Sequence, residues 1–372
     1  MNLPKIRNGI CLEVNPEGCG RNTRAWIEMA RARPITNGPK SALVLGASGG
    51  YGLASRVAAA FGCGAKTLGV SLERPPGEGR DGTPGWYNNA AFDAEANAAG
   101  LVCATLNADA FSDAARDAVA SAATCHGFGA FDLVVYSIAS PVRADPETGE
   151  VWRSAIKPIG AAHTATTVDF ITGAMKPVTI SAATEEEVRA TVKVMGGEDW
   201  LRWMRFLRGR NLLAEGAKTV AFSYVGPART HGIYRHGTLG KAKEDLEATA
   251  AKIKDETRVE AFVAINKAVV TRASAVIPAM PPYIAALFRV MKAKGLHEGC
   301  FEQMDRLFRE RLFTGNAVPV DDAGRIRMDD LEMRDDVQAD VAEILAGMTS
   351  ENAEAVSDLA GYREAFLALH GF

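Results

Sequence analysis

The sequence is poor in cysteine. Its 372 residues include six cysteines, none in a C-x-x-C pair, at positions 11, 19, 63, 103, 125 and 300. The spacing lacks the C-x-x-C pairs of zinc ribbons, and no secretion signal accompanies the scattered cysteines, which argues against a disulfide framework. We therefore expect reduced thiols and a cytoplasmic location.

Long apolar runs, histidine motifs and a charge excess are also missing. No apolar run approaches the ~20 residues of a transmembrane helix, and residues 1–11 are too polar for a secretion signal. The six histidines show no H-E-x-x-H spacing, and the net charge is only −3. We expect a globular protein that takes no metal and has no nucleic-acid or membrane partner.

What the sequence does contain is a glycine-rich turn between an apolar run and a helical pattern. Residues 41–52 read SALVLGASGGYG, and LASRVAAAF follows at once. Glycines let the backbone turn sharply and approach a pyrophosphate, whose charge is then held by the N–H groups that begin the helix. This order predicts the first βα unit of a dinucleotide-binding fold. The spacing of Gly46, Gly50 and Gly52 is typical of short-chain dehydrogenases.

An acidic residue follows the second apolar run at the position where a ribose would lie. The run spans residues 67–72, and Glu73 comes 21 residues after Gly52. A carboxylate there accepts hydrogen bonds from ribose hydroxyls and repels a 2′-phosphate, which favours NADH over NADPH. The adjacent Arg74 leaves room for NADPH.

The same turn also fits a second motif. Residues 46–50 match G-x-S-x-G, the nucleophile elbow of α/β-hydrolases, with Ser48 as the nucleophile. That alternative needs an acid and a histidine later in the chain, such as Asp245 and His297. It does not explain Gly52 or Glu73.

Strands and helices alternate from residue 41 to about residue 140, which predicts a doubly wound parallel sheet. The predicted fold class is α/β and Rossmann-type, short-chain-dehydrogenase-like, with insertions and an N-terminal β element. We expect one large domain over residues 1–372. Within it we distinguish an N-terminal β/α element (1–40), a first nucleotide-binding half (41–140) and a catalytic and substrate-covering part (196–300).

Two further strand ends are expected at the cofactor crevice. Asp109 and Ala110 follow a strand over residues 101–107, and Asp109 either faces the adenine amine or caps a helix over 112–123. Residues 137–140 follow a strand over 132–136. The carboxyl ends of parallel strands line the ligand crevice, so this turn is expected beside the cofactor ribose.

Other segments have a structural interpretation. Helices are expected over residues 22–31, 182–195 and 199–213, and a loop over 74–87. Trp200, Trp203, Met204 and Leu207 share one face of the third helix, which indicates core packing. Residues 307–372 contain a short β element, RIRM, and two helices, with no catalytic pattern.

The candidate chemistry follows a fifth strand over residues 218–225. Tyr234 and Lys243 are nine residues apart, a spacing that would place them on opposite faces of one helix. Gly237 and Gly240 interrupt the segment, so we expect Tyr234 on a loop and Lys243 in the first turn of a helix beginning near residue 241. A phenol can donate a proton to a developing oxyanion. A lysine can bind the ribose hydroxyls and lower the tyrosine pKa from about 10.

Two other assignments compete at this stage. Lys241 could replace Lys243, and Tyr224, at the strand end, could replace Tyr234. A packed tyrosine and a surface lysine would be the structural alternative.

At the Y-x8-K spacing the chain resembles the trans-2-enoyl-CoA reductase family, which includes the FabV-type enoyl-acyl-carrier-protein reductases. The resemblance runs from residue 10 to residue 372. Its motifs are GASGGYGLASR, GWYN, DAFSD, DLVVYSIASPVR, KPIG, MGGEDW, EGAKTVAFSY, HEGC and the ending GYREAFLALHGF.

The resemblance implies NADH-dependent reduction of the C2=C3 double bond of a trans-2-enoyl thioester, carried on coenzyme A or acyl-carrier protein, as the last step of fatty acid elongation. It also implies a monomer. The alternative function is a short-chain-type NAD(P)H carbonyl reductase acting on a 3-ketoacyl thioester.

The resemblance also implies site residues. Tyr234 would be the proton donor, Lys243 would assist it and bind NAD, and Tyr224 would contact the thioester carbonyl. The remaining cofactor-binding residues would be Gly46, Ala47, Ser48, Gly49, Gly50, Tyr51, Leu72, Glu73, Asp109, Ala110, Ile138, Ala139, Val269, Val270 and Thr271. The chain departs from the family at Ser71–Leu72, where aromatics are common, and at Glu244, where many members have lysine.

Overall fold

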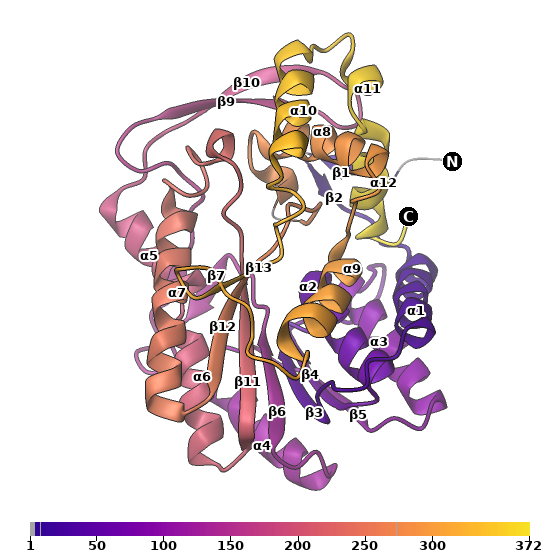
Figure 1. The fold of residues 1–372 in the computed structure, drawn as a ribbon, viewed down its shortest axis with the longest axis vertical. Coiled ribbons are helices and arrows are strands. Elements are labelled where there is room, and N and C mark those ends of the chain that lie inside the picture. The colour runs from indigo at the N-terminus through magenta and orange to yellow at the C-terminus, as the bar shows by residue number, and fades with distance from the viewer. Residues whose placement is uncertain (1–3, 8, 273) are drawn as a thin grey trace.

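The computed structural model describes residues 4–7, 9–272 and 274–372. Its centre is a parallel sheet of seven strands in the order β13-β12-β11-β6-β3-β4-β5 (Figure 1). The strands are β3 (Ser41–Leu45), β4 (Lys66–Ser71), β5 (Cys103–Asn107), β6 (Phe131–Tyr136), β11 (Leu213–Ser223), β12 (Glu260–Ile265) and β13 (Arg325–Arg327). The chain adds strands outward from β3 in one direction and then in the other. The predicted doubly wound α/β sheet is confirmed, and its switch point lies between β3 and β6.

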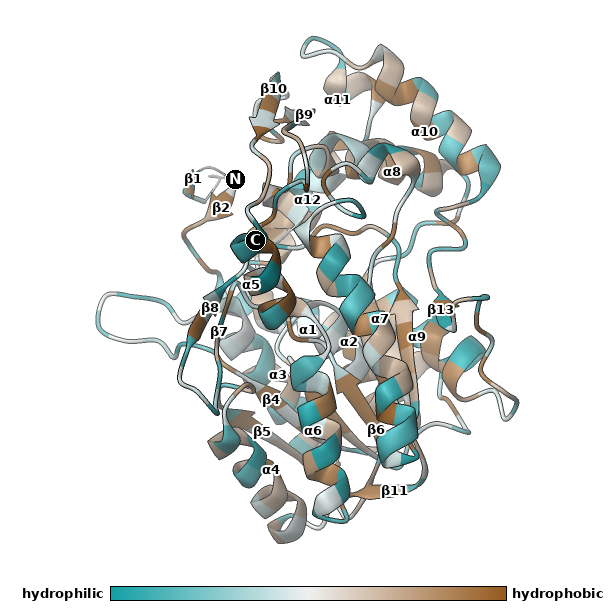
Figure 2. Cartoon of the chain, turned by 90° about the vertical axis from the view of Figure 1, so that its left-hand side faces the viewer, coloured by the Kyte–Doolittle hydropathy of each residue, from teal (hydrophilic) through white to brown (hydrophobic). Residues whose placement is uncertain are grey.

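Helices cover both faces of this sheet because its strands are apolar on both sides. Ala42 and Val44 pack into a core with one helix group, and Leu43 and Leu45 pack into a second core with another. The first group is α1 (Pro16–Ala32), α2 (Gly50–Val57), α3 (Pro84–Ala98) and α9 (Cys300–Leu307). The second is α4 (Asp113–Cys125), α6 (Glu198–Gly209) and α7 (Thr238–Thr257). In Figure 2 the strands are mostly brown, whereas α4 and α6 carry both teal and brown segments.

A third core lies beyond the sheet and forms a cap at one end of the molecule (Figure 1). The cap comprises the antiparallel hairpin β9 (His163–Val168)–β10 (Met175–Ile180) with α8 (Met280–Ala293), α10 (Asp335–Gly347), α11 (Ala353–Val356) and α12 (Leu359–Ala368). Phe170, at the tip of the hairpin, packs against Phe366 with ring centroids 4.7 Å apart. The cap therefore joins segments that are far apart in the sequence.

Shorter elements complete the fold. The hairpins β1 (Ile6–Arg7)–β2 (Ile10–Cys11) and β7 (Val142–Ala144)–β8 (Val151–Arg153) are both antiparallel. Helix α5 (Glu185–Met195) begins with a capping box between Thr184 and Glu187. The remaining helical turns are η1 (Ala58–Gly62), η2 (Ala228–Thr230), η3 (Ser274–Val276) and η4 (Phe308–Leu312).

Several predicted boundaries were wrong. Helix α1 begins at Pro16 rather than residue 22, because Asn15 accepts from the Gly18 N–H and proline suits the first helical position. The predicted 74–87 loop ends earlier, since α3 begins at Pro84. Helix α7 begins at Thr238 rather than near residue 241.

Other expectations about single elements were confirmed. Trp200 and Trp203 are fully buried in the core, as the helical spacing predicted. RIRM forms β13, which extends the main sheet at its edge. Within the described residues, no helix has the length and apolar character needed to cross a bilayer.

Candidate active site

The residues predicted for the site lie just beyond the carboxyl ends of six neighbouring strands. The turn of residues 46–51 follows β3, residues 72–73 follow β4, and residues 109–110 follow β5. Residues 138–139 follow β6, Tyr224 follows β11, and residues 269–271 follow β12. Because all these strands are parallel, their carboxyl ends share one edge of the sheet. This edge is where doubly wound folds bind ligands.

The glycine turn after β3 is shaped by close backbone contacts. Gly46 has a φ of +86°, and a Cβ there would lie 2.2 Å from the Ser137 carbonyl oxygen. A Cβ on Gly52 would lie 2.0 Å from the Gly46 carbonyl oxygen. The two glycines pack the turn against β6 and deliver the chain into the N-terminus of α2. The resulting cradle of backbone N–H groups fits a pyrophosphate.

Glu73 is buried at the end of β4 and anchored on several sides. Its carboxylate accepts hydrogen bonds from Ser48 Oγ at 2.5 Å and from the Thr83 hydroxyl. The Asn107 side chain accepts from the Glu73 N–H at 2.7 Å and donates to its carbonyl oxygen at 2.9 Å. These contacts fix the carboxylate beside the glycine turn. Leu72, by contrast, is 68% exposed.

Sequence reasoning did not identify Thr83 and Asn107 as partners of Glu73. Thr83 lies in the segment that was interpreted as a proline- and glycine-rich loop, where hydroxyl residues are common. Asn107 is the last residue of β5. The available signal was its place at a strand end next to β4, since neighbouring parallel strands bring such residues together.

The nucleophile-elbow alternative does not assemble in the structure. Ser48 donates its hydrogen bond to Glu73. Asp245 accepts from the Gly197 N–H at 2.8 Å, and His297 packs edge-on against Phe288 with ring centroids 4.5 Å apart. These contacts link neither the acid nor the imidazole to Ser48, so the geometry does not support a Ser–His–acid triad.

Asp109 does not cap helix α4. The cap is Ser112, whose hydroxyl accepts from the Ala115 N–H at 3.1 Å, while Asp109 Oδ1 accepts from the Phe111 N–H at 3.0 Å. The capping alternative was therefore wrong. Ala110 is buried, and its carbonyl oxygen accepts from Trp203 Nε1 at 2.9 Å. The hydrogen bond from Trp203 thus attaches this loop to helix α6.

The two candidate tyrosines contact each other. Tyr224 directly follows β11, and Tyr234 lies in the turn between η2 and α7. Their rings meet edge to face with centroids 4.9 Å apart and an interplanar angle of 81°. The two tyrosines are therefore not alternatives, because the fold places both rings side by side in the site.

Of the two candidate lysines, only Lys243 points into the site. Its Nζ donates to the Phe222 carbonyl oxygen at 3.0 Å, at the end of β11. Lys241 is more than half exposed and pairs with Glu244 at 2.9 Å. As predicted, Tyr234 lies on a loop and Lys243 on the helix that follows, but Lys243 lies in the second turn and not the first, because α7 begins at Thr238.

Burial controls the proton affinity of this group. It lowers the pKa of Lys243 to about 8, although Glu247 opposes the shift. It raises the pKa of Tyr234 to about 12, and that of Tyr224 well above the ordinary phenol value. The expected lowering of the tyrosine pKa by lysine was wrong, because desolvation dominates. Both phenols keep their protons at neutral pH, as hydrogen-bond donors require.

The loop after β12 is tied to the glycine turn. The Tyr51 hydroxyl donates to the Lys267 carbonyl oxygen at 2.9 Å, and Gln303 donates to the Tyr51 oxygen at 3.2 Å. Val269 and Val270 are buried, and the Thr271 N–H donates to Ser274 Oγ at 2.8 Å. The loop thus presents a fixed backbone next to Tyr51.

One buried acid at this edge was missed by sequence reasoning. Glu332, which follows β13, accepts hydrogen bonds from Tyr224, from Tyr283 on α8 and from the Ala268 N–H. Its sequence context is the acidic segment DDLE of residues 329–332, which resembles a solvated loop. Only the position after a strand could have signalled a place in the site.

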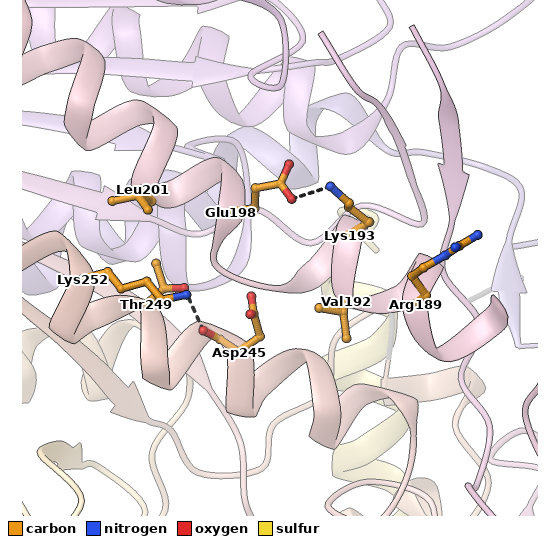
Figure 3. Close-up of a pocket in the computed structure, with 8 residues that line it drawn as sticks. All are labelled: Arg189, Val192, Lys193, Glu198, Leu201, Asp245, Thr249 and Lys252. Carbon is orange, nitrogen blue, oxygen red and sulfur yellow. Dashed lines mark hydrogen bonds and ion pairs between the residues drawn. The ribbon is translucent and has the colours of Figure 1, made fainter. Parts of the chain in front are cut away.

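A separate cavity lies away from these residues, between α5, α6 and α7 (Figure 3). Its volume is about 390 Å³. Its charged lining is partly neutralised, since Lys193 pairs with Glu198 at 2.7 Å. None of the residues predicted to bind the cofactor or the thioester lines this cavity; Asp245, the acid considered for the nucleophile elbow, does.

Three family models match successive parts of the chain. They are described as the NAD(P)H binding domain of trans-2-enoyl-CoA reductase (residues 1–78), the trans-2-enoyl-CoA reductase catalytic region (residues 80–313) and an enoyl reductase FAD binding domain (residues 320–372).

The structure of residues 320–372 does not fit a flavin dinucleotide. Strand β13 is followed by Asp329, Asp330 and Glu332 and not by a glycine-rich turn that could cradle a pyrophosphate. Helices α10 and α12 pack against α8 through buried apolar side chains. The segment completes the sheet and the cap, and we assign it no flavin chemistry.

Relatives and solved structures agree with the first two models. The chain is 50% identical to the NADH-dependent enoyl-[acyl-carrier-protein] reductase of Coxiella burnetii, over 99% of this chain and 92% of the relative. It is 52% identical to the NADH-dependent trans-2-enoyl-CoA reductase of Treponema denticola, over 99% and 95%. The crystal structure of the Treponema denticola reductase with NAD superposes with a TM-score of 0.97, at 51% identity, covering 100% of this chain and 95% of that one. The chain belongs to the trans-2-enoyl-CoA reductase family.

Proposed function

We propose that this protein reduces the C2=C3 double bond of trans-2-enoyl thioesters with NADH, producing saturated acyl thioesters. The observation that carries this function is the pair of protonated, touching phenols of Tyr224 and Tyr234, with Lys243 Nζ bonded to the carbonyl oxygen of Phe222, two residues before Tyr224. They lie at the sheet edge that also carries the glycine cradle. Relatives with about half of their residues identical are named for this reaction.

The residues present fit the dinucleotide. The turn of residues 46–51 would cradle its pyrophosphate, and Glu73 would accept from the adenosine ribose. Residues 109–110 would border the adenine, and residues 138–139 with Lys243 the nicotinamide ribose. The buried loop of residues 269–271 would border the nicotinamide. When bound, NADH supplies the hydride for C3 of the substrate.

The two phenols act on the charge that develops in the substrate. Reduction at C3 moves negative charge to the thioester oxygen, which becomes an enolate oxygen. Tyr224 and Tyr234 are the donors for this oxygen, each worth about 3 kcal/mol in an oxyanion-hole role. Tyr234 then delivers a proton to C2, directly or through a linked water. Its high pKa keeps the proton in place until that charge appears.

The carrier of the acyl group is coenzyme A or acyl-carrier protein, since relatives are named for each. We also propose a monomeric, cytoplasmic enzyme folded as one domain over residues 1–372. All six cysteines are free, which favours a reducing compartment.

The test is loss of NADH absorbance with crotonyl-CoA, with acetoacetyl-CoA in parallel and protein without thioester as the blank. Oxidation of NADH with crotonyl-CoA alone supports enoyl reduction. Oxidation with acetoacetyl-CoA alone would move the function to a carbonyl reductase that uses the same tyrosines. Cleavage of the thioester without oxidation of NADH would contradict both functions.

A further inference from the structure

A buried carboxyl group from the C-terminal segment accepts a hydrogen bond from the Tyr224 hydroxyl. Glu332 has no exposed surface. Its Oε1 accepts from the Tyr224 hydroxyl at 3.1 Å and from the Tyr283 hydroxyl at 2.6 Å. Its Oε2 accepts from the Ala268 N–H at 2.7 Å. One carboxyl group therefore contacts a candidate catalytic phenol, the covering helix α8 and the loop after β12.

This arrangement controls where the Tyr224 hydrogen points. A phenol has one hydrogen to donate. While Glu332 is ionised, that hydrogen is donated to the carboxylate, and the Tyr224 oxygen offers the substrate only lone pairs. When Glu332 carries a proton, its O–H can donate to a phenol oxygen. The Tyr224 hydrogen is then free to turn toward the thioester oxygen.

The surroundings of Glu332 oppose a fixed negative charge. Burial raises its pKa, and Asp329, which is paired with Arg327, adds to the shift. Lys267 and the Tyr283 hydroxyl oppose it. The titratable and charged groups that face Glu332 come from five parts of the chain, namely Tyr224 after β11, Tyr283 on α8, Lys267 after β12, Tyr51 on α2, and Asp329 of its own segment.

A neutral amide also borders this network. Gln338 on α10 donates to the Tyr283 oxygen at 3.2 Å and to the Glu332 carbonyl oxygen at 2.8 Å. The Gln338 amide therefore bonds to the Tyr283 oxygen and to the Glu332 backbone, but not to the Glu332 carboxyl group. The donors to that carboxyl group are the hydroxyls of Tyr224 and Tyr283 and the Ala268 N–H. On its other side, the Tyr224 ring meets the Tyr234 ring edge to face.

We propose that Glu332 is a positioning residue for the reduction, whose protonation decides whether the Tyr224 hydroxyl donates toward the thioester or back into the protein. The proposal rests on the proposed role of Tyr224 at the thioester oxygen. It assigns to residues 320–372 a part in the reaction that does not involve a flavin.

The experiment compares pH profiles of kcat for wild type and Glu332→Gln with crotonyl-CoA, at saturating NADH. The glutamine amide can donate to the phenol oxygens while its carbonyl accepts from Ala268, so it imitates the protonated acid at every pH. We expect wild-type kcat to fall about tenfold per pH unit above the ionisation of Glu332, until the Tyr224 contribution is lost. We expect Glu332→Gln to lack this fall.

Glu298→Gln is the matched control, because Glu298 is a buried acid paired with Arg306, and it should keep the wild-type profile.

Tyr224→Phe separates this inference from the proposed function. If Tyr224→Phe leaves kcat unchanged, the role of Tyr224 itself fails. If it lowers kcat while Glu332→Gln keeps the wild-type profile, Tyr224 retains its role and the inference about Glu332 is overturned. Adding Glu332→Gln to Tyr224→Phe should change the profile no further, because Glu332 acts through Tyr224.

Tyr283→Phe provides a second test if Glu332→Gln does not fold. Loss of the Tyr283 donor removes a hydrogen bond that stabilises the ionised acid. The alkaline fall in kcat should then move to higher pH. An unmoved profile in a folded Tyr283→Phe protein overturns the proposal.

Discussion

Tyr234 and Lys243 respond to the same burial in opposite ways, because desolvation always disfavours the charged form. The phenol holds its proton more tightly, with a pKa of about 12, and the ammonium holds its proton less tightly, with a pKa of about 8. Near neutral pH the site therefore contains a neutral donor and a cation. Each is in the protonation state that its proposed role requires.

Replacing Tyr234 with phenylalanine removes the proposed proton donor and leaves the aromatic ring in place. We expect kcat for crotonyl-CoA to fall about 100-fold or more, with little change in the Kd for NADH, because the hydroxyl acts on the substrate. Steady-state kinetics and NADH fluorescence titration measure the two quantities. Near wild-type turnover would remove Tyr234 from the role of acid.

The binding of NADH should weaken as pH rises through the pKa of Lys243. Below about pH 8 the ammonium is present and can donate to the ribose hydroxyls, and above it the charge is lost. We expect the Kd for NADH to rise about tenfold between about pH 7 and about pH 9. Fluorescence titration at several pH values measures this change.

Lys241 supplies the control for the pH dependence. It lies two residues away on the same helix, is exposed and pairs with Glu244. Lys241→Met should keep the wild-type pH dependence, whereas Lys243→Met should bind NADH weakly at every pH. The same dependence in both variants would show that another group titrates.

At the level of residues, the sequence could predict groups that carry a local pattern. Gly46 and Glu73 were found by spacing, whereas for Tyr234 and Lys243 the spacing left Tyr224 and Lys241 open and the resemblance made the choice. Lys243 reaches the same sheet edge from α7, since its Nζ donates to the Phe222 carbonyl oxygen at the end of β11. Glu332 has no such pattern, because its partners are supplied by β11, α8 and the loop after β12. A residue defined by tertiary contacts alone leaves no periodic signal in its own segment.

Among the elements, the turn between β3 and α2 shows a steric demand that overrides helix propensity. Gly52 lies within α2, where alanine would ordinarily be favoured by about 1 kcal/mol. A Cβ at this position would lie 2.0 Å from the Gly46 carbonyl oxygen. We therefore expect Gly52→Ala to destabilise the protein by about 2 kcal/mol or more in urea unfolding.

Gly49 is the matched control in the same turn. Its φ of −168° is extended backbone that any residue adopts, and a Cβ there would meet nothing within 4 Å. Gly49→Ala should change the free energy of unfolding by less than about 0.5 kcal/mol. Equal destabilisation by both substitutions would show that contacts of the Cβ do not explain the need for glycine.

Element predictions succeeded where apolar periodicity was strong and failed where side chains face solvent. The strands β3 and β6 are buried runs of hydrophobic residues, and their positions were predicted within a residue or so. The hairpin β9–β10 was missed because β9 is rich in threonine and both strands are only partly buried. Its turn did carry a signal, since Asp169 accepts from Ile171 and Thr172 N–H groups and Gly173 has a φ of +76°.

At the scale of the whole molecule, the N-terminal and C-terminal segments of the chain contact each other. The Asn15 N–H donates to the His370 carbonyl oxygen at 2.8 Å, and Gly18 packs against the Gly371 backbone. The apolar cluster of the cap, with the partly buried residues packed against it, includes residues from Ile6 to Phe372. Such long-range closure could not be predicted from local patterns. Only the resemblance to a whole family extended from one end of the sequence to the other.

This closure predicts that the sheet and the cap unfold together. All five tryptophans lie between Trp26 and Trp203, so tryptophan fluorescence reports the sheet with its flanking helices, whereas circular dichroism reports helices throughout. We expect the two signals to give one midpoint.

Deletion of residues 369–372 should lower both midpoints equally, because it removes the acceptor for Asn15. Asn22→Ala, which removes only an exposed hydrogen bond to Ala368, should shift them much less. Helical signal lost before the tryptophan signal would instead identify the cap as a separate folding unit and contradict the single-domain prediction.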